Sequence, residues 1–312
     1  MTLSNPASPR LQGVVVPLAT PLNEDESIDL AGLRKLLRHV LDGGVDGIFL
    51  LGSTSEFPAL ADSEKARLIE ATVSEVSGAV PLFVGSGSVS TLDAIRQARR
   101  AAELGADAIV VTTPYYYTYG PDPQAMLLEH FTQMAAAVDL PLVAYNIPQL
   151  TGLPLNLATV ERLVEAGRIT GIKDSHGDMV YFQRLLEIQR SRQPLSVAQG
   201  ADALIAVSVL AGARAVVVSG ANVAPRLTKS LFEASVTGRV DEAMRLQYQL
   251  MEVIALYQGR GSPVGVKSCL EALGICSRRA TRPFLPMTDA EMARVRDKLA
   301  ALGLMPAPAR PM

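Results

Sequence analysis

The chain has 312 residues, of which 48% are hydrophobic and 19% are charged, and its 29 Lys and Arg nearly balance its 31 Asp and Glu. A formal net charge of −2 without a run of like charges argues against nucleic acid or an anionic membrane as a partner. Two cysteines, Cys269 and Cys276, form neither a disulfide framework nor a metal-ligand spacing. The longest apolar stretch, 203–213, is too short for a membrane span, which needs about 20 residues. We therefore expect a globular, cytoplasmic protein whose partner is a small molecule.

Eight short apolar runs rich in β-branched residues predict strands. They are GVVVP (13–17), DGIFL (46–50), PLFVG (81–85), DAIVV (107–111), PLVAY (141–145), ITGIK (169–173), PLSVA (194–198) and ARAVVV (213–218). Longer segments with apolar residues at helical spacing separate them. Because the runs are apolar throughout rather than alternating, they are typical of buried parallel strands. Eight such units predict an α/β fold, a (β/α)8 TIM barrel, with a doubly wound open sheet as the alternative.

The remaining segments extend this barrel at both ends. Residues 1–12 are predicted to be an N-terminal extension, and 13–237 the barrel itself. Residues 238–303 are expected to form a C-terminal appendage of three helices, at about 238–258, 263–275 and 288–303. The Pro-rich residues 304–312 are expected to be a flexible tail.

A single lysine stands out at the end of a predicted strand. The active site of a TIM barrel forms at the carboxyl ends of its strands, and Lys173 ends the sixth one. The other five lysines are expected in helices or at the surface: Lys35, Lys65, Lys229, Lys267 and Lys298. A buried ammonium must pair with a carboxylate or lose its proton, and a neutral amine can attack a ketone to form an iminium ion. Lys173 is thus either a Schiff-base nucleophile or a structural partner of Asp174.

Tyr145 is the second candidate, because it ends the neighbouring strand. It precedes Lys173 by 28 residues, which is one strand-helix unit, so the two side chains are expected about 5 Å apart on adjacent strands. A phenol at that place can relay protons during covalent catalysis. The alternative is an ordinary core tyrosine at the mouth of the barrel.

Three turns that follow strands carry small polar residues. The turn 52–56, GSTSE, offers hydroxyl and backbone N–H groups that suit a carboxylate, or it is a simple Ser/Thr turn. The turn 85–87, GSG, lacks the third glycine of a dinucleotide motif because residue 90 is Ser, and is interpreted as a tight turn. The turn 219–222, SGAN, lies where TIM barrels bind phosphate, although a helix cap explains it equally well.

The histidines do not predict a metal site. His39, His130 and His176 are scattered, and none has a second ligand at a metal-binding spacing. A metal-dependent aldolase or hydrolase is therefore disfavoured.

Five segments together resemble the dihydrodipicolinate synthase and N-acetylneuraminate lyase family of class I pyruvate-dependent aldolases. They are GSTSE (52–56), TPYYY (113–117), YNIP (145–148), GIKD (171–174) and SGANVAP (219–225), and the likeness runs from Gly13 to about Pro286.

The resemblance implies specific roles for several residues. It implies that Lys173 forms a Schiff base with pyruvate or another 2-oxo acid and that Tyr145 relays protons. Ser53 and Thr54 would bind the carboxylate of the 2-oxo acid. Tyr116 would enter the site of a neighbouring subunit, in a homotetramer built as a dimer of dimers. By the same likeness, Thr54 and Tyr116 join Lys173 and Tyr145 as catalytic residues, and Gly200, Asp202 and Ser219 are predicted substrate contacts. The likeness implies neither a metal nor an organic cofactor.

Departures from the family pattern concern the second substrate. Synthases carry an arginine two residues after the YNxP proline, but Leu150 stands there in this chain. A leucine cannot replace a bidentate guanidinium for a second carboxylate. Only Asp202 remains of the Asp-Glu pair that the sialate lyases have after the seventh strand, and Ser55 replaces a usual glycine. The pattern is closer to the 2-keto-3-deoxy-gluconate aldolase-like branch.

Our leading hypothesis is a Schiff-base aldolase that cleaves or makes a 2-keto-3-deoxy sugar acid. One alternative uses the same iminium ion for dehydration of such an acid or for synthesis of dihydrodipicolinate. A different class of function is a non-catalytic barrel that binds or senses sugar acids.

Overall fold

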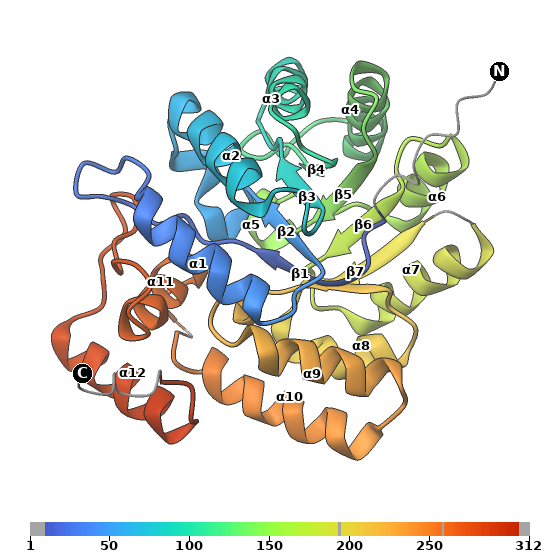
Figure 1. The fold of residues 1–312 in the computed structure, drawn as a ribbon. Coiled ribbons are helices and arrows are strands. Elements are labelled where there is room, and N and C mark those ends of the chain that lie inside the picture. Colours follow the sequence, from blue (N-terminus) through green and yellow to red (C-terminus); the bar gives the residue numbers. More distant parts are fainter. Residues whose placement is uncertain (1–9, 193–194, 258, 306–312) are drawn as a thin grey trace.

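The computed structural model describes residues 10–192, 195–257 and 259–305, and it shows a closed parallel barrel (Figure 1). The strands are β1 (Gly13–Pro17), β2 (Gly47–Leu50), β3 (Leu82–Gly85), β4 (Ala108–Thr112), β5 (Leu142–Asn146), β6 (Gly171–Asp174), β7 (Ser196–Gln199) and β8 (Ala215–Val217). Because β1 pairs in parallel with both β2 and β8, the barrel prediction is confirmed and the open-sheet alternative is wrong. Each strand lies within two residues of its predicted place, and residue 194 of the predicted seventh strand lies outside the described residues.

Helices alternate with the strands and surround the barrel (Figure 1). They are α1 (Leu30–Asp42), α2 (Asp62–Val76), α3 (Thr91–Glu103), α4 (Pro123–Ala137), α6 (Leu157–Glu165), α7 (Met179–Ser191), α8 (Ile205–Leu210) and α9 (Pro225–Val236), with the short α5 (Pro148–Thr151) after β5. Side chains cap several of them; Asp29, for example, accepts hydrogen bonds from the backbone N–H groups of Ala31 and Gly32 at the start of α1. Short 3₁₀ turns stand at the carboxyl ends of β2, β7 and β8: η1 (Ser53–Ser55), η2 (Phe57–Ala59), η3 (Asp202–Leu204) and η4 (Ser219–Asn222).

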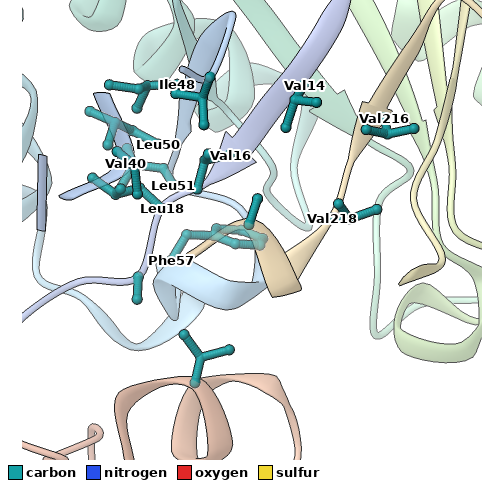
Figure 2. Close-up of a cluster of buried hydrophobic side chains, with 14 of the residues drawn as sticks. Val14, Val16, Leu18, Val40, Ile48, Leu50, Leu51, Phe57, Val216 and Val218 are labelled. Atoms are coloured by element: carbon teal, nitrogen blue, oxygen red, sulfur yellow. The ribbon is translucent and has the colours of Figure 1, made fainter. Parts of the chain in front are cut away.

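The strands are buried on both faces, which explains why their sequences are apolar throughout. Val14, Val16 and Ile48 point outward and pack in one cluster with Val40 of α1 (Figure 2). A second cluster fills the inside of the barrel, with Val15, Phe49, Phe83, Val110, Val143 and Tyr145 among its members. Successive residues of a strand therefore face the helices and the barrel interior in turn.

Three helices follow α9, as the sequence predicts. They are α10 (Val240–Ile254), α11 (Ser262–Ala272) and α12 (Asp289–Ala301), each somewhat shorter than its predicted range. Figure 1 shows α10 beside α9, and α11 contacts both η1 and η4 at the carboxyl ends of β2 and β8. The C-terminal helices thus reach the edge of the barrel where the site residues lie. Residues 1–9 of the predicted extension and 306–312 of the predicted tail lie outside the described residues.

Lys267 lies in α11 as expected, but it is fully buried rather than at the surface. Its Nζ is 2.5 Å from Oε1 of Glu56, at the end of the GSTSE turn. The other oxygen of Glu56 accepts hydrogen bonds from the backbone N–H and the hydroxyl of Thr281, at 2.7 and 2.8 Å. Burial lowers the pKa of Lys267, and the charge of Glu56 opposes that shift. This ion pair joins the turn after β2 to the C-terminal region.

We predict that Lys267→Met destabilises the fold strongly, because it leaves the Glu56 carboxylate buried without its cation. Removing one partner of such a pair typically costs about 3 to 5 kcal/mol. The double variant Glu56→Gln/Lys267→Met should lose much less than the sum of the two single changes. Urea unfolding of all four proteins measures this. Additive losses would show that the two side chains do not stabilise each other.

Candidate active site

Lys173 points into the mouth of the barrel and is only 4% exposed. The register between β5 and β6 places it directly beside Tyr145, which is 2% exposed. Its Nζ lies 4.0 Å from the centre of the Tyr145 ring and 5.1 Å from the centre of the Phe49 ring. Within the described residues, Lys173 forms no ion pair. The structure therefore holds an amine in an aromatic environment next to a phenol.

Asp174 faces the opposite way and does not pair with Lys173. One of its oxygens accepts a hydrogen bond from Nδ2 of Asn146 at 2.7 Å, and the other has no partner among the described residues. Burial raises the pKa of Asp174 to about 6, while the bond from Asn146 and the proximity of His176 work in the other direction. The alternation of a strand explains the arrangement, because consecutive residues point to opposite faces. The alternative prediction, that Lys173 is a structural partner of Asp174, is thus wrong.

The GSTSE turn lies over the ring that contacts Lys173. Its first residue, Gly52, is so close to Phe49 that an added Cβ would come within 2.7 Å of the ring. The backbone N–H groups of Ser53 and Thr54 donate no hydrogen bond within the described part of the chain. Two adjacent free N–H groups can hold a carboxylate. The geometry is compatible with the predicted carboxylate-binding role of Ser53 and Thr54.

Contacts of Thr54 and Ser55 with neighbouring segments keep this turn in place. The hydroxyl of Thr54 lies 3.1 Å from that of Ser262, at the start of α11. The hydroxyl of Ser55 lies 2.7 Å from the hydroxyl of Thr20, which also donates to the Ser55 carbonyl at 2.9 Å. The serine at this position therefore adds a buried bond to the loop after β1.

The predicted substrate contacts after β7 and β8 serve different purposes. Gly200 leaves room for the lysine, since an added Cβ would lie 3.1 Å from Cε of Lys173 and 2.0 Å from the hydroxyl of Ser175. Asp202 accepts hydrogen bonds from the Ser219 hydroxyl at 3.0 Å and from the Gly220 N–H at 2.7 Å. Burial raises the pKa of Asp202, and the hydrogen bonds from Gly220 and Ser219 work against that shift. Both Asp202 oxygens bind protein groups, which favours a structural role for Asp202 and Ser219.

Tyr116 lies at the surface of the single chain, 79% exposed. Its backbone φ of +80° falls in the left-handed region, which a bulky residue rarely adopts. Its ring packs edge to face against Tyr117, with 5.0 Å between the centres. The structure thus presents this tyrosine outward, in a strained conformation.

The described residues contain no group of three His, Cys, Asp or Glu side chains placed to hold a metal. His130 is buried, with Nδ1 2.9 Å from the Thr91 hydroxyl, and burial lowers its pKa to about 4. Among the helices described, none has the length and apolar character needed to cross a bilayer.

Sequence reasoning missed a cavity of about 430 Å³ at the mouth of the barrel. It includes Ser53 of the GSTSE turn and Thr112, which stands beside Tyr145 in the register of β4 and β5. Leu150, the departure noted in the sequence, also lines it. The remaining lining comes from the turn after β2, from Tyr115, and from residues of the C-terminal region. Ser53 and Leu150 were both singled out in the sequence, but the cavity itself was not predicted because its walls come from segments far apart in the sequence.

We predict that Asp174→Asn stabilises the protein increasingly as the pH rises. In the unfolded chain Asp174 ionises near pH 3.8, whereas in the folded chain it does so near pH 6. Below pH 3.8 the Asp174 carboxyl is protonated in both states, and its ionisation does not affect stability. Between pH 3.8 and 6 the cost of burying the ionised carboxylate lowers the stability of the folded state increasingly. Above pH 6 this cost is complete, at about 3 kcal/mol. Unfolding free energies of both proteins between pH 4 and 7.5 measure this difference. The exposed Asp139→Asn is the control, and a pH-independent difference for Asp174→Asn would contradict the prediction.

Comparisons with known proteins assign this chain to a family. Residues 10–302 match the model of the Dihydrodipicolinate synthetase family. A DapA-like lyase of Halobacterium salinarum, described as uncharacterized, is 37% identical over 95% of both chains. A 4-hydroxy-tetrahydrodipicolinate synthase of Gluconacetobacter diazotrophicus is 33% identical over 94% of this chain and 98% of the relative. A prophage protein of E. coli K12 from the dihydrodipicolinic acid synthase family, solved in complex with pyruvate, is 28% identical with a TM-score of 0.88, over 94% of this chain and 99% of that one. The chain therefore belongs to the dihydrodipicolinate synthetase family, as its motifs indicate, and is a carbon–carbon lyase.

Proposed function

We propose that the protein forms a Schiff base between Lys173 and pyruvate and uses it to cleave or make a 4-hydroxy-2-oxo acid. The observation that carries this proposal is the buried Lys173 amine, which has no carboxylate partner among the described residues and lies 4.0 Å from the centre of the Tyr145 ring. A binding protein gains nothing from burying an amine in this way, because desolvation of an unpaired ammonium is costly. The pyruvate complex of the E. coli relative supports a 2-oxo acid as the ligand.

The proposed reaction uses three groups of the chain. The carboxylate of the substrate binds the N–H groups of Ser53 and Thr54, and the Lys173 amine attacks C2 and expels water to give an iminium ion. Tyr145 gives its phenol proton to the hydroxyl that leaves as water. The resulting phenolate then takes the proton from the C4 hydroxyl as the C3–C4 bond breaks, and the electron pair of that bond passes to the iminium nitrogen. The aldehyde leaves, and protonation of the resulting enamine at C3 followed by hydrolysis releases pyruvate. The aldol addition runs through the same steps in reverse.

This mechanism is shared by several possible overall reactions. Cleavage of a 2-keto-3-deoxy sugar acid is the reaction predicted from the sequence, and membership of the 2-keto-3-deoxy-gluconate aldolase-like branch remains part of that prediction. Dehydration of such an acid and synthesis of 4-hydroxy-tetrahydrodipicolinate begin from the same iminium ion. Leu150 stands in the place of the synthase arginine, and this disfavours a substrate with a second carboxylate. We place this activity in the cytoplasm.

We predict that borohydride in the presence of pyruvate adds a stable covalent mass at Lys173. The variant Lys173→Ala should show no adduct, whereas the exposed Lys35→Ala should react like the unchanged protein. Tyr145→Phe should still form the adduct, with kcat lowered by about 10² to 10⁴ because the proton relay is lost. Mass spectrometry of peptides locates the adduct, and an unmodified Lys173 would refute the proposed function.

We also propose that Tyr116 completes the site of a neighbouring subunit, in a dimer that pairs into a homotetramer. The support is its exposure and its strained backbone, since strain of this kind persists where a functional position requires it. Tyr117 and Tyr119 beside it are exposed as well, so the loop presents a cluster of aromatic rings suited to an interface.

We predict that two inactive variants restore each other's activity. A mixed dimer of Lys173→Ala and Tyr116→Ala chains has one complete site, because the first chain lends Tyr116 to the Lys173 of the second. Random re-association of equal amounts should recover about a quarter of the normal activity, since half of the dimers are mixed and each has one working site. Activity after mixing and dilution from mild denaturant tests this. No recovery, with dimers intact, would show that Tyr116 acts elsewhere.

A further inference from the structure

We propose that the aldehyde half of the substrate carries an apolar group, either aromatic or branched aliphatic, in place of a polyol chain or a second carboxylate. This inference rests on the proposed function and concerns the 430 Å³ cavity at the mouth of the barrel. A cavity of this size accommodates a six-carbon group or a benzene ring together with the reacting carbons.

The walls of the cavity are mostly apolar. Phe57 and Pro58 come from the turn after β2, Ile147 and Leu150 follow β5, and Pro263 and Phe284 come from the C-terminal region. The Tyr115 ring packs edge to face against Phe57, with 6.1 Å between the centres, and burial raises the pKa of its hydroxyl, so that it stays neutral. Such a surface favours an apolar ligand group, because the transfer of apolar surface out of water is favourable.

The charges around the cavity do not suit an acidic substrate. Among the described residues that line it, Glu56 is the one charged side chain, and Lys267 already neutralises it from the other side. No Arg or Lys is present in that lining, so a second carboxylate would meet apolar groups and the end of a paired glutamate. Binding an unpaired carboxylate there would be strongly unfavourable.

The hydroxyl groups of the lining offer little to a polyol. Thr151 is bonded to Thr113 and to the Ile147 carbonyl, and Ser262 is bonded to Thr54. The hydroxyls of Thr112, Ser53 and Tyr115 have no partner among the described residues, and that of Thr112 is buried. A chain of several hydroxyls would lose its hydrogen bonds to water and gain few in return. Apart from the carboxylate end at Ser53, this wall suits substrate oxygens only near Thr112 and Tyr115.

The cavity lies on the side of the site where the aldehyde must be. Thr112 stands beside Tyr145 in the strand register, and Ile147 follows Tyr145 by two residues on the same face. Ser53, which binds the carboxylate end in the proposed mechanism, also lines the cavity. A substrate held at Ser53 and bonded to Lys173 at C2 therefore directs C4, next to Tyr145, and its substituent into the cavity.

The test is aldol addition of pyruvate to four aldehydes at matched concentrations: benzaldehyde, 3-methylbutanal, D-glyceraldehyde and aspartate semialdehyde. We expect kcat/KM for the two apolar aldehydes to exceed that for the two polar ones by about tenfold or more, a ratio typical of pocket discrimination. A preference for D-glyceraldehyde or aspartate semialdehyde would overturn the inference. Borohydride trapping with pyruvate alone is run beside it, so that loss of the Schiff base is distinguished from a wrong aldehyde class.

A pair of leucine variants ties the preference to this cavity. Leu150 lines it and is 63% exposed, whereas Leu285 is 75% exposed and does not line it. Leu150→Arg should lower kcat/KM for the apolar aldehydes by about tenfold and raise it for aspartate semialdehyde, with pyruvate trapping unchanged. Leu285→Arg should leave all four values unchanged. Equal behaviour of the two variants would show that the aldehyde does not occupy the cavity.

Discussion

The register between β5 and β6 is the constraint on which the whole site depends. It places Lys173 next to Tyr145 and turns Asp174 outward to Asn146. A slip of one residue would exchange the two faces, and the carboxylate would then occupy the barrel interior in place of the amine. Closure of the barrel prevents such a slip, because β6 is paired on both sides and neither neighbour has a free edge.

The turn that is proposed to bind the substrate carboxylate is held in place by residues from the far end of the chain. Glu56 binds Lys267 and Thr281, and Thr54 contacts Ser262, so that α11 and the segment after it support the GSTSE turn. Glu56 adopts a left-handed backbone with φ +61°, a conformation that costs free energy and persists only where surrounding contacts enforce it. The C-terminal helices are thus part of the site's support, although none of the proposed catalytic groups comes from them.

Local patterns were enough to predict the barrel and the lysine, but not the contacts between distant segments. Uniformly apolar runs at regular spacing identify the strands, and the 28-residue step identifies Tyr145 and Lys173 as neighbours. The pattern around Lys267 equally identifies a helix, yet it does not say that a glutamate 211 positions earlier meets its ammonium group. The hydrogen bonds between Asp202, Ser219 and Gly220 were likewise not predictable from the sequence. The predicted strands place Asp202 and Ser219 at the same edge of the barrel. Their hydrogen-bond partners depend on side-chain geometry, which the periodicity of the sequence does not reveal.

The two halves of the proposed substrate contact parts of the protein that differ in their tolerance of amino-acid substitution. The pyruvate half is bound by groups packed inside the barrel, where a Cβ added at Gly200 would already collide with Ser175 and crowd Lys173. The aldehyde half meets loops and partly exposed side chains such as Leu150, whose substitution disturbs little packing. Chemistry held by a packed interior and specificity carried by loops can therefore vary independently. Family membership accordingly supports the reaction of the iminium ion, while the second substrate has to be inferred from the walls of this chain's own cavity.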